Sequence, residues 1–376
     1  MNTTSKFFRI SYPIVAIMCI AFLASACGAP PEEKKPNPPK TNKPVAPKLK
    51  PVTPLSQTAF VYVRKRSKSQ NDIYTYDTKT KKQKLVVKVD GPDTSRWSEV
   101  NISLSPDRQW IAFTGHFRQS ETERATKYPI EALWLVSVDG KQFRRLSKPI
   151  PAPTKPRHGY TRSLRNPQWS NDGKSIWLLM GQFWQDSSYK TQGGVSIAKI
   201  PSTGGQIETM PKAVLCQVTE SLRTSRSQNR FAVTHSNCSS GRSGIYTYDN
   251  IAKKFHHYSI HESYRKLKVA QWSNTSAHMY FISKTTWEDS NTGKIIEATG
   301  VFKMDLKSGK TDSILHPLVN GKEYTQFILL ADNKTMVMEL IDPKTKTKDL
   351  FHTTYKDRFK VYHPITQHGQ SFAIAN

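Results

Sequence analysis

The sequence predicts an all-β fold, a six-bladed β-propeller of four-stranded antiparallel blades that occupies residues 58–376. Three observations support it. A strand–turn–strand unit with a Ser-Pro-Asp-type turn recurs along the chain, each copy is followed by two more short strands, and the two chain ends carry complementary parts of one further unit. A unit of four short strands, repeated about every 45–55 residues, is typical of propellers.

Residues 1–26 are predicted to be a signal peptide. A basic start is followed by the apolar run 14–24, which is too short to span a bilayer, since that takes roughly 20 residues. The small residues before Cys27 resemble a bacterial lipobox. This resemblance implies a lipoprotein with acyl chains such as palmitate on Cys27, anchored in the cell envelope at the outer membrane and facing the periplasm. The alternative is an ordinary signal peptide.

Residues 27–57 are predicted to be a disordered linker between the lipidated cysteine and the propeller. They are rich in Pro and Lys and carry few apolar side chains. Such a segment cannot bury a core and should form extended, polyproline-like chain.

The strand–turn–strand units begin at residue 101. The clearest copies are 101–113, 166–178 and 269–281, and weaker ones are 222–231 and 328–337. Trp169 and Trp272 occupy equivalent positions and are expected to lie between blades. The third and fourth strands are expected at 132–138 and 143–146, 195–200 and 206–209, 244–248 and 255–258, 301–305 and 311–315, and 350–355 and 359–362.

The two ends of the chain complete the sixth blade. Residues 60–63, 73–76 and 84–87 are predicted to be its second to fourth strands, and 371–375 its missing first strand. The ring is therefore expected to close by pairing of the N- and C-terminal strands.

The best copies of the repeat resemble a known family. The Ser-Pro-Asp-x turn followed by Ile-Ala-Phe, at 105–113, is similar to the WD40-like repeat of TolB and of the propellers in prolyl-oligopeptidase-type enzymes. The resemblance covers about residues 58–376 and implies a TolB-like six-bladed propeller. TolB carries an additional α/β domain before its propeller, where this chain has the Pro/Lys linker, so the resemblance does not extend to TolB's partner contacts.

The longest connections are expected on one face of the ring. Connections between second and third strands, and between successive blades, share a face, and long loops on a rigid scaffold often carry binding sites. These segments are 115–131, 148–166, 181–194, 235–243 and 284–299. The candidate binding residues are Lys155, Arg157, His158, Tyr160, Arg162, Arg165, Phe183, Trp184 and Tyr189. Arginines among aromatics can hold an anion or a peptide; the alternative is a solvated basic surface.

Cys216 and Cys238 are predicted to form a disulfide. The hairpin that turns at 225–228 should pair residues whose numbers sum to about 453, and 216 and 238 sum to 454. Opposed strand positions approach within disulfide range, and export provides an oxidising compartment. Two buried free thiols are the alternative.

The charge balance indicates anionic partners. The chain has 56 Lys and Arg against 29 Asp and Glu, a formal net charge of +27. In an exported protein this favours lipid head groups, lipopolysaccharide, peptidoglycan carboxylates or an acidic protein face. The export signal argues against nucleic acid, and nothing in the sequence implies a cofactor or fixes the oligomeric state.

Catalytic patterns are missing from the sequence. There is no Gly-x-Ser-x-Gly motif, and His256 and His257 should point to opposite sides of a strand, which disfavours a shared metal. The sequence therefore predicts no catalytic or metal residues, and a lipid-anchored scaffold that is not an enzyme. The alternatives are a hydrolase or lyase acting on peptide or polysaccharide in a propeller face, and a sensor of a ligand or polysaccharide.

Overall fold

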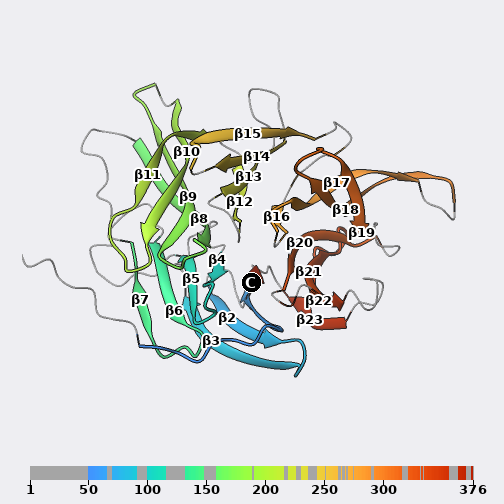
Figure 1. The fold of residues 1–376 in the computed structure, drawn as a ribbon, viewed down its shortest axis with the longest axis horizontal. Coiled ribbons are helices and arrows are strands. Elements are labelled where there is room, and N and C mark those ends of the chain that lie inside the picture. The colour runs from blue at the N-terminus through green and yellow to red at the C-terminus, as the bar shows by residue number, and fades with distance from the viewer. Residues whose placement is uncertain are drawn as a thin grey trace, which may run out of the picture. The chain divides into compact units, whose positions relative to one another are not determined.

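Six four-stranded antiparallel sheets surround a common axis, which confirms the predicted six-bladed β-propeller (Figure 1). The structure is a computed structural model, and the residues it describes belong to one compact unit, 46–376. The described residues are 50–65, 70–90, 100–115, 132–147, 158–188, 190–215, 219–225, 230–235, 244–249, 251–260, 264, 267, 270–273, 275–288, 292–315, 321–330, 332, 334–354, 363–369 and 374–375.

Five blades follow one another along the chain, and blade 1 joins its two ends. Blade 1 consists of β24 (Ile374–Ala375), β1 (Ala59–Lys65), β2 (Gln70–Asp77) and β3 (Lys82–Asp90). Blade 2 consists of β4 (Asn101–Leu104), β5 (Trp110–Gly115), β6 (Ala132–Ser137) and β7 (Phe143–Arg145). Blade 3 consists of β8 (His158–Trp169), β9 (Ser175–Gln185), β10 (Thr191–Pro201) and β11 (Glu208–Leu215).

The remaining blades have the same order of strands. Blade 4 consists of β12 (Thr219–Thr224), β13 (Arg230–His235), β14 (Gly244–Asp249) and β15 (Lys254–Ser259). Blade 5 consists of β16 (Ala270–Trp272), β17 (His278–Glu288), β18 (Ile295–Asp305) and β19 (Thr311–Leu315). Blade 6 consists of β20 (Glu323–Leu329), β21 (Thr335–Ile341), β22 (Lys348–Thr354) and β23 (His363–Gly369). The first strand of each blade, or β24 in blade 1, is the inner strand nearest the axis (Figure 1).

The repeated turn is held by its own serine and aspartate. In blade 2 the Ser105 hydroxyl donates to Asp107 Oδ1 (2.5 Å) and accepts from the Trp110 amide (2.9 Å). Blade 3 repeats the arrangement, and there the Ser170 hydroxyl donates to Asp172 Oδ1 (2.6 Å). Each turn thus satisfies its own backbone donors with a short polar side chain, which is why the motif recurs where the first two strands meet.

The repeated tryptophans join neighbouring blades, as the sequence predicts. Trp169 Nε1 donates to the Ser103 carbonyl of blade 2 (3.1 Å), and Trp272 Nε1 donates to the Arg223 carbonyl of blade 4 (3.0 Å). Both rings are buried. Because each indole bonds the inner strand of the preceding blade, the pattern sets the spacing of the blades around the ring.

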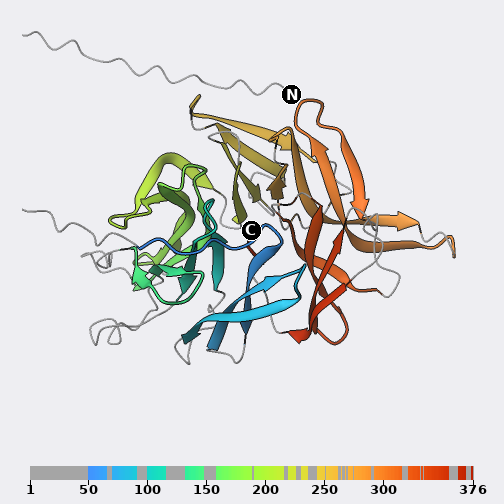
Figure 2. The ribbon, with the colours of Figure 1, turned by 60° about the horizontal axis from the view of Figure 1, so that its bottom comes forward.

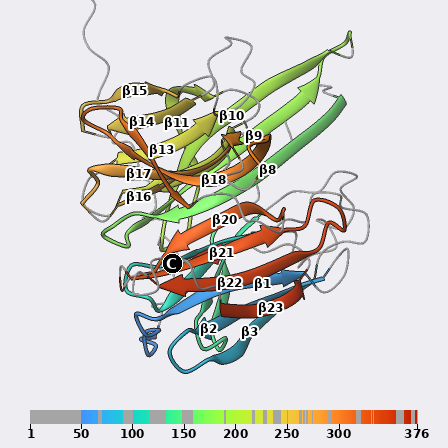
Figure 3. The same cartoon turned by 90° about the vertical axis from the view of Figure 1, so that its right-hand side faces the viewer.

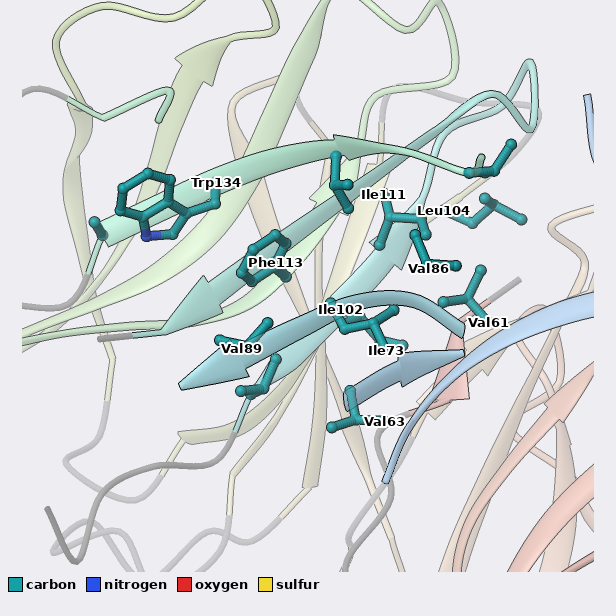
Figure 4. Close-up of a cluster of buried hydrophobic side chains, with 14 residues drawn as sticks. Val61, Val63, Ile73, Val86, Val89, Ile102, Leu104, Ile111, Phe113 and Trp134 are labelled. Carbon is teal, nitrogen blue, oxygen red and sulfur yellow. The ribbon is translucent and has the colours of Figure 1, made fainter. Parts of the chain in front are cut away.

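The hydrophobic core lies in layers between blades. One layer joins Val61 and Ile73 of blade 1 to Ile102, Phe113 and Trp134 of blade 2 (Figure 4). Each large side chain buried in this way contributes about 1.5–3 kcal/mol. Each of the six clusters of buried side chains among the described residues joins two neighbouring blades, so packing between neighbours stabilises the ring.

The two ends of the chain close the ring, as predicted. β24 pairs with β1, with Val61 opposite Ala375 and Tyr62 opposite Ile374. Figures 1 and 2 show this last strand at the centre of the ring, beside the N-terminal strand. The C-terminal strand β24 is thus held in the same sheet as the first strand, β1.

The fourth strand of blade 6 differs from the prediction. The sequence placed it at 359–362, which lies outside the described residues, whereas the structure has β23 at His363–Gly369 with Pro364 opposite Phe351. Pro364 is tolerated here because the outermost strand of a blade needs no amide donor on its free edge.

Residues 50–58 lie against the tight turns of blade 2. Lys50 and Gln142 exchange two hydrogen bonds (3.0 and 3.1 Å), and the Val52 amide donates to Gln109 Oε1 (3.0 Å). The buried Arg108 donates through Nη2 to the Ser56 carbonyl (2.8 Å) and the Ala59 carbonyl (2.5 Å). The chain therefore enters the propeller across the face that carries these turns.

Candidate functional site

Two blades extend well beyond the others. In blade 3, β9 and β10 have 11 residues each, as do β17 and β18 in blade 5, whereas β5 and β6 have 6. Five extra residues lengthen a strand by about 16 Å. Figure 3 shows β8, β9 and β10 extending together, and Figure 1 shows the β17–β18 hairpin reaching outward.

Two of the long connections expected from the sequence are therefore paired strands. Gln185 lies opposite Thr191 in blade 3, and Glu288 lies opposite Ile295 in blade 5. The expectation that 181–194 and 284–299 are loops was wrong, because most of each segment is paired strand. Both hairpins do lie on the predicted face, because they join second to third strands.

The blade-3 projection, defined here as residues 158–165, 180–185 and 191–195, presents an amide-rich face. Gln182 lies opposite Gly194, and Trp184 lies opposite Gln192. Directly opposed residues share a face of a sheet, and so do alternate residues along a strand. Gln182, Trp184 and Gln192 therefore lie on one face, and Gly194 leaves space beside Gln182.

The turn of the projection is fixed by Asp186. Its carboxylate accepts hydrogen bonds from the amides of Ser188 (2.9 Å) and Lys190 (3.0 Å) and from Gln192 Nε2 (2.8 Å). The bond from the Gln192 side chain, followed by that from Lys190, lowers the pKa of Asp186 below its ordinary value. Asp186 therefore stays ionised at neutral pH and orients the Gln192 amide.

Gly193 brings the two strands close together under Trp184. Its φ is +103°, and a Cβ built there would lie 1.9 Å from the Gln182 carbonyl oxygen and 2.9 Å from Trp184 Cζ3. Only glycine fits this position. The indole covers the bare backbone, so Trp184 is placed by the hairpin and is not a freely rotating surface side chain.

The structure separates the predicted binding residues. Phe183 packs against the core between blades 3 and 4, and Arg165 lies opposite Leu179 at the level of the ring, while Trp184 belongs to the projection. His158, Tyr160 and Arg162 belong to β8, with their side chains outside the description. Lys155, Arg157 and Tyr189 lie outside the described residues.

The sequence alone did not single out Gln182, Gln192 and Asp186 as binding residues. Arginines and aromatics were the favoured residue types, and amides gave no signal until the register placed two of them beside an indole. Gln182 and Gln185 are separated by Phe183 and Trp184, which is not the alternation of a strand, so the sequence did not indicate the paired hairpin.

The cysteines of the predicted disulfide and the predicted lipidation site lie outside the described residues. The open end of the β12–β13 hairpin has Thr219 opposite His235, whose numbers sum to 454, the same sum as 216 and 238. The pairing of Cys216 with Cys238 and the lipidation of Cys27 stay predictions.

Metal and membrane signals were sought among the described residues. No group of three His, Cys, Asp or Glu side chains there could hold a metal ion. Within the same part of the chain, no helix is long and apolar enough to cross a membrane.

Comparison with known proteins supports the fold. The sequence matches no family model and no curated protein. Among solved structures, an oligogalacturonate lyase in complex with manganese is similar with a TM-score of 0.51 and 10% identity, over 83% of this chain and 74% of the other. The β-propeller domain of the Trilobed protease from Pyrococcus furiosus has a TM-score of 0.45 and 12% identity, covering 83% and 95%. An acylaminoacyl peptidase has a TM-score of 0.44 and 11% identity, covering 84% and 51%.

A similar propeller belongs to an oligogalacturonate lyase, which contradicts the prediction that the chain is not an enzyme. At such low identity the likeness shows the fold alone and carries over no activity. Membership of the TolB family stays a prediction. The chain is a six-bladed β-propeller.

Proposed function

We propose that the protein is a lipid-anchored propeller of the cell envelope that binds an anionic polysaccharide on its blade-3 projection. The observation that carries the proposal is the face formed by Gln182, Trp184 and Gln192. An indole gives a flat apolar surface for a sugar ring, and amides both donate and accept hydrogen bonds, as sugar hydroxyls require.

The ligand's charge is inferred from the protein's own. The net charge of +27 draws acidic polymers toward the surface. The exposed Lys190 stands at the turn of the projection, and Arg162 is a residue of β8 opposite Gln182. We favour a polysaccharide over lipid head groups or an acidic protein because amides and a single indole match hydroxyl-rich rings better than phosphates or apolar side chains.

The entry of the chain into the ring supports this placement. Residues 50–58 cross the tight-turn face of blade 2, and the projection extends from the opposite face. The described chain therefore begins on the face opposite the projection. Replacing Cys27 with Ser should release the protein from the membrane fraction. Retention there would contradict the lipid anchor but not the binding of polysaccharide.

The binding test uses Trp184→Ala, with retention on immobilised polygalacturonate and calorimetry with the soluble polymer. Loss of a central contact of at least about 1 kcal/mol predicts at least about fivefold weaker binding. Trp287→Ala is the matched control, because Trp287 also covers a glycine, Gly300, in the blade-5 hairpin. Its affinity should match that of wild type.

The polymer should also be analysed after incubation with the protein. Shortened chains would assign the protein to the hydrolase or lyase alternative, with binding on the same face. Equal retention of wild type and Trp184→Ala would contradict the proposal, as would binding of acidic lipid vesicles in preference to the polymer.

A further inference from the structure

The tight-turn face of the ring is formed by the turns that join first to second strands and third to fourth strands. Every blade places at least one exposed lysine on a turn of this face. One lysine from each blade, in chain order, gives the set Lys79, Lys141, Lys174, Lys253, Lys307 and Lys334. Positive charge therefore recurs around the whole of this face.

The carboxylates of the same turns are bound to the turn backbone. Asp139 accepts a hydrogen bond from the Lys141 amide (3.0 Å), and Asp305 accepts one from the Lys307 amide (3.0 Å). Such a carboxylate is held close to its own turn, whereas a lysine carries its ammonium group on a flexible four-carbon stem. The charge that extends furthest from these turns is therefore positive.

An exposed isoleucine stands among these lysines. Ile251 is 80% exposed, more than any other large apolar side chain that the structure describes. It belongs to the turn between β14 and β15, directly before the exposed Lys253 and Lys254, and its amide donates to Asp249 Oδ1 (2.9 Å). The turn thus presents one apolar side chain and two ammonium groups together, on a backbone that its own aspartate holds.

This combination matches the surface of an acidic bilayer. Lysines are attracted to the phosphates of acidic lipids, and a neighbouring apolar side chain can enter the boundary of the acyl layer. A protein partner fits less well, because lysine is depleted in protein interfaces, whose central contacts are mainly aromatic side chains and arginine. Lysines spread over six blades also suit an extended surface of like charges better than a single pocket.

We propose that the tight-turn face docks on an acidic phospholipid bilayer, with Ile251 entering the acyl boundary and the lysines beside it holding lipid phosphates. The docking does not rest on polysaccharide binding at the blade-3 projection, which extends from the opposite face. It does not require acyl chains on Cys27 either, so it can be tested without them.

The test is co-sedimentation with vesicles of phosphatidylcholine mixed with phosphatidylglycerol, at low salt. The reference is the full chain with Cys27→Ser, which should bind these vesicles and be released at high salt. Replacing Lys253 and Lys254 together with Gln should weaken binding at least about fivefold, since one lysine near an acidic bilayer contributes about that factor. Ile251→Ser should weaken binding as well, and Ile251→Trp should strengthen it, because tryptophan favours the bilayer interface.

Two variants on the opposite face are matched controls. Lys344→Gln together with Lys346→Gln removes two exposed lysines from the β21–β22 turn, and Ile295→Ser removes an isoleucine that is 75% exposed in the blade-5 hairpin. Both should bind vesicles as the reference does. If the lysine control weakens binding as much as the change at 253 and 254, the overall charge attracts the chain and the proposal is overturned.

Further outcomes separate this docking from other occupants and from the proposed function. Equal binding of pure phosphatidylcholine vesicles would overturn the docking, and so would tighter binding of polyglutamate than of vesicles at equal charge, which would indicate an acidic protein partner. Trp184→Ala should bind vesicles as the reference does, and a loss there would move lipid binding to the projection and overturn the proposal. A preference for vesicles over polygalacturonate counts against the polysaccharide and supports the docking, provided that the change at 253 and 254 abolishes it.

Discussion

Glu339 is a fully buried carboxylate at the seam where blade 6 meets blade 1. It lies opposite Leu350 in the β21–β22 register, and Leu350 packs with Phe60 of blade 1. Lys348 Nζ lies 3.1 Å from Glu339 Oε1, and the Thr325 hydroxyl donates to the same oxygen. Lys348 therefore places a positive charge beside Glu339, inside the layer that closes the ring.

Changing Lys348 to Met should remove this cationic partner from a buried carboxylate. Breaking such a pair costs about 3–5 kcal/mol, and we expect about 3 because the Lys348 side chain is 24% exposed and water partly replaces it. For a domain of this size each kcal/mol lowers the melting temperature by about 2–4 °C. Circular dichroism at pH 7 should therefore show melting about 6–12 °C below wild type.

Two further variants isolate the cause. Lys310→Met breaks an exposed pair with Asp312, 3.6 Å apart, and should change the melting temperature by no more than about 1 °C. The double variant Lys348→Met with Glu339→Leu removes both charges and should recover most of the loss. A single Lys348→Met variant that melts within about 2 °C of wild type would show that the pair with Glu339 does not stabilise the ring.

Three other predictions concern the chain ends, the cysteines and the projection. Deleting 371–376 should lower the melting temperature by about 4–8 °C, because about two strand hydrogen bonds of about 1 kcal/mol each are lost; an unchanged value would sink the closure argument. The unreduced, denatured protein should show no thiols at Cys216 and Cys238, whose bond closes a loop of about 22 residues and contributes roughly 3 kcal/mol; two reactive thiols there would rule the bond out. The lowered pKa of Asp186 stabilises the turn above the pKa of the unfolded chain and ceases to do so as pH falls through the folded value. Amide exchange at 186–192 should therefore rise in acid, and a flat profile between pH 6 and pH 2 would contradict the role of Asp186.

The architecture could be predicted because its signals are local. Ser105 and Asp107 satisfy their own turn, and Trp169 bonds the blade before it, so each leaves a fixed spacing in the sequence. Ring closure followed from counting strands at the two ends. These features depend on residues a few positions apart, and the repeat makes each of them visible several times.

From the sequence, only the face of the ring that carries the candidate site could be predicted, and not its residues. Gly193 and Gly194 read as loop residues, although Gly193 is required by the close approach of Gln182, and Gln192 gains its role only from the register that brings it beside Trp184. Arg165 appeared in a basic stretch whose sequence does not show that it lies at ring level on an inner strand. Contacts between blades decide the surroundings of such a side chain, and spacing along one chain does not encode them.

Amide hydrogen–deuterium exchange with and without polygalacturonate tests the central claim most directly. If the projection binds the polymer, exchange should slow in residues 180–195 and stay unchanged in the equally long β17–β18 hairpin. Protection confined to blade 5 or to the tight-turn face, or no protection anywhere at saturating polymer, would contradict it.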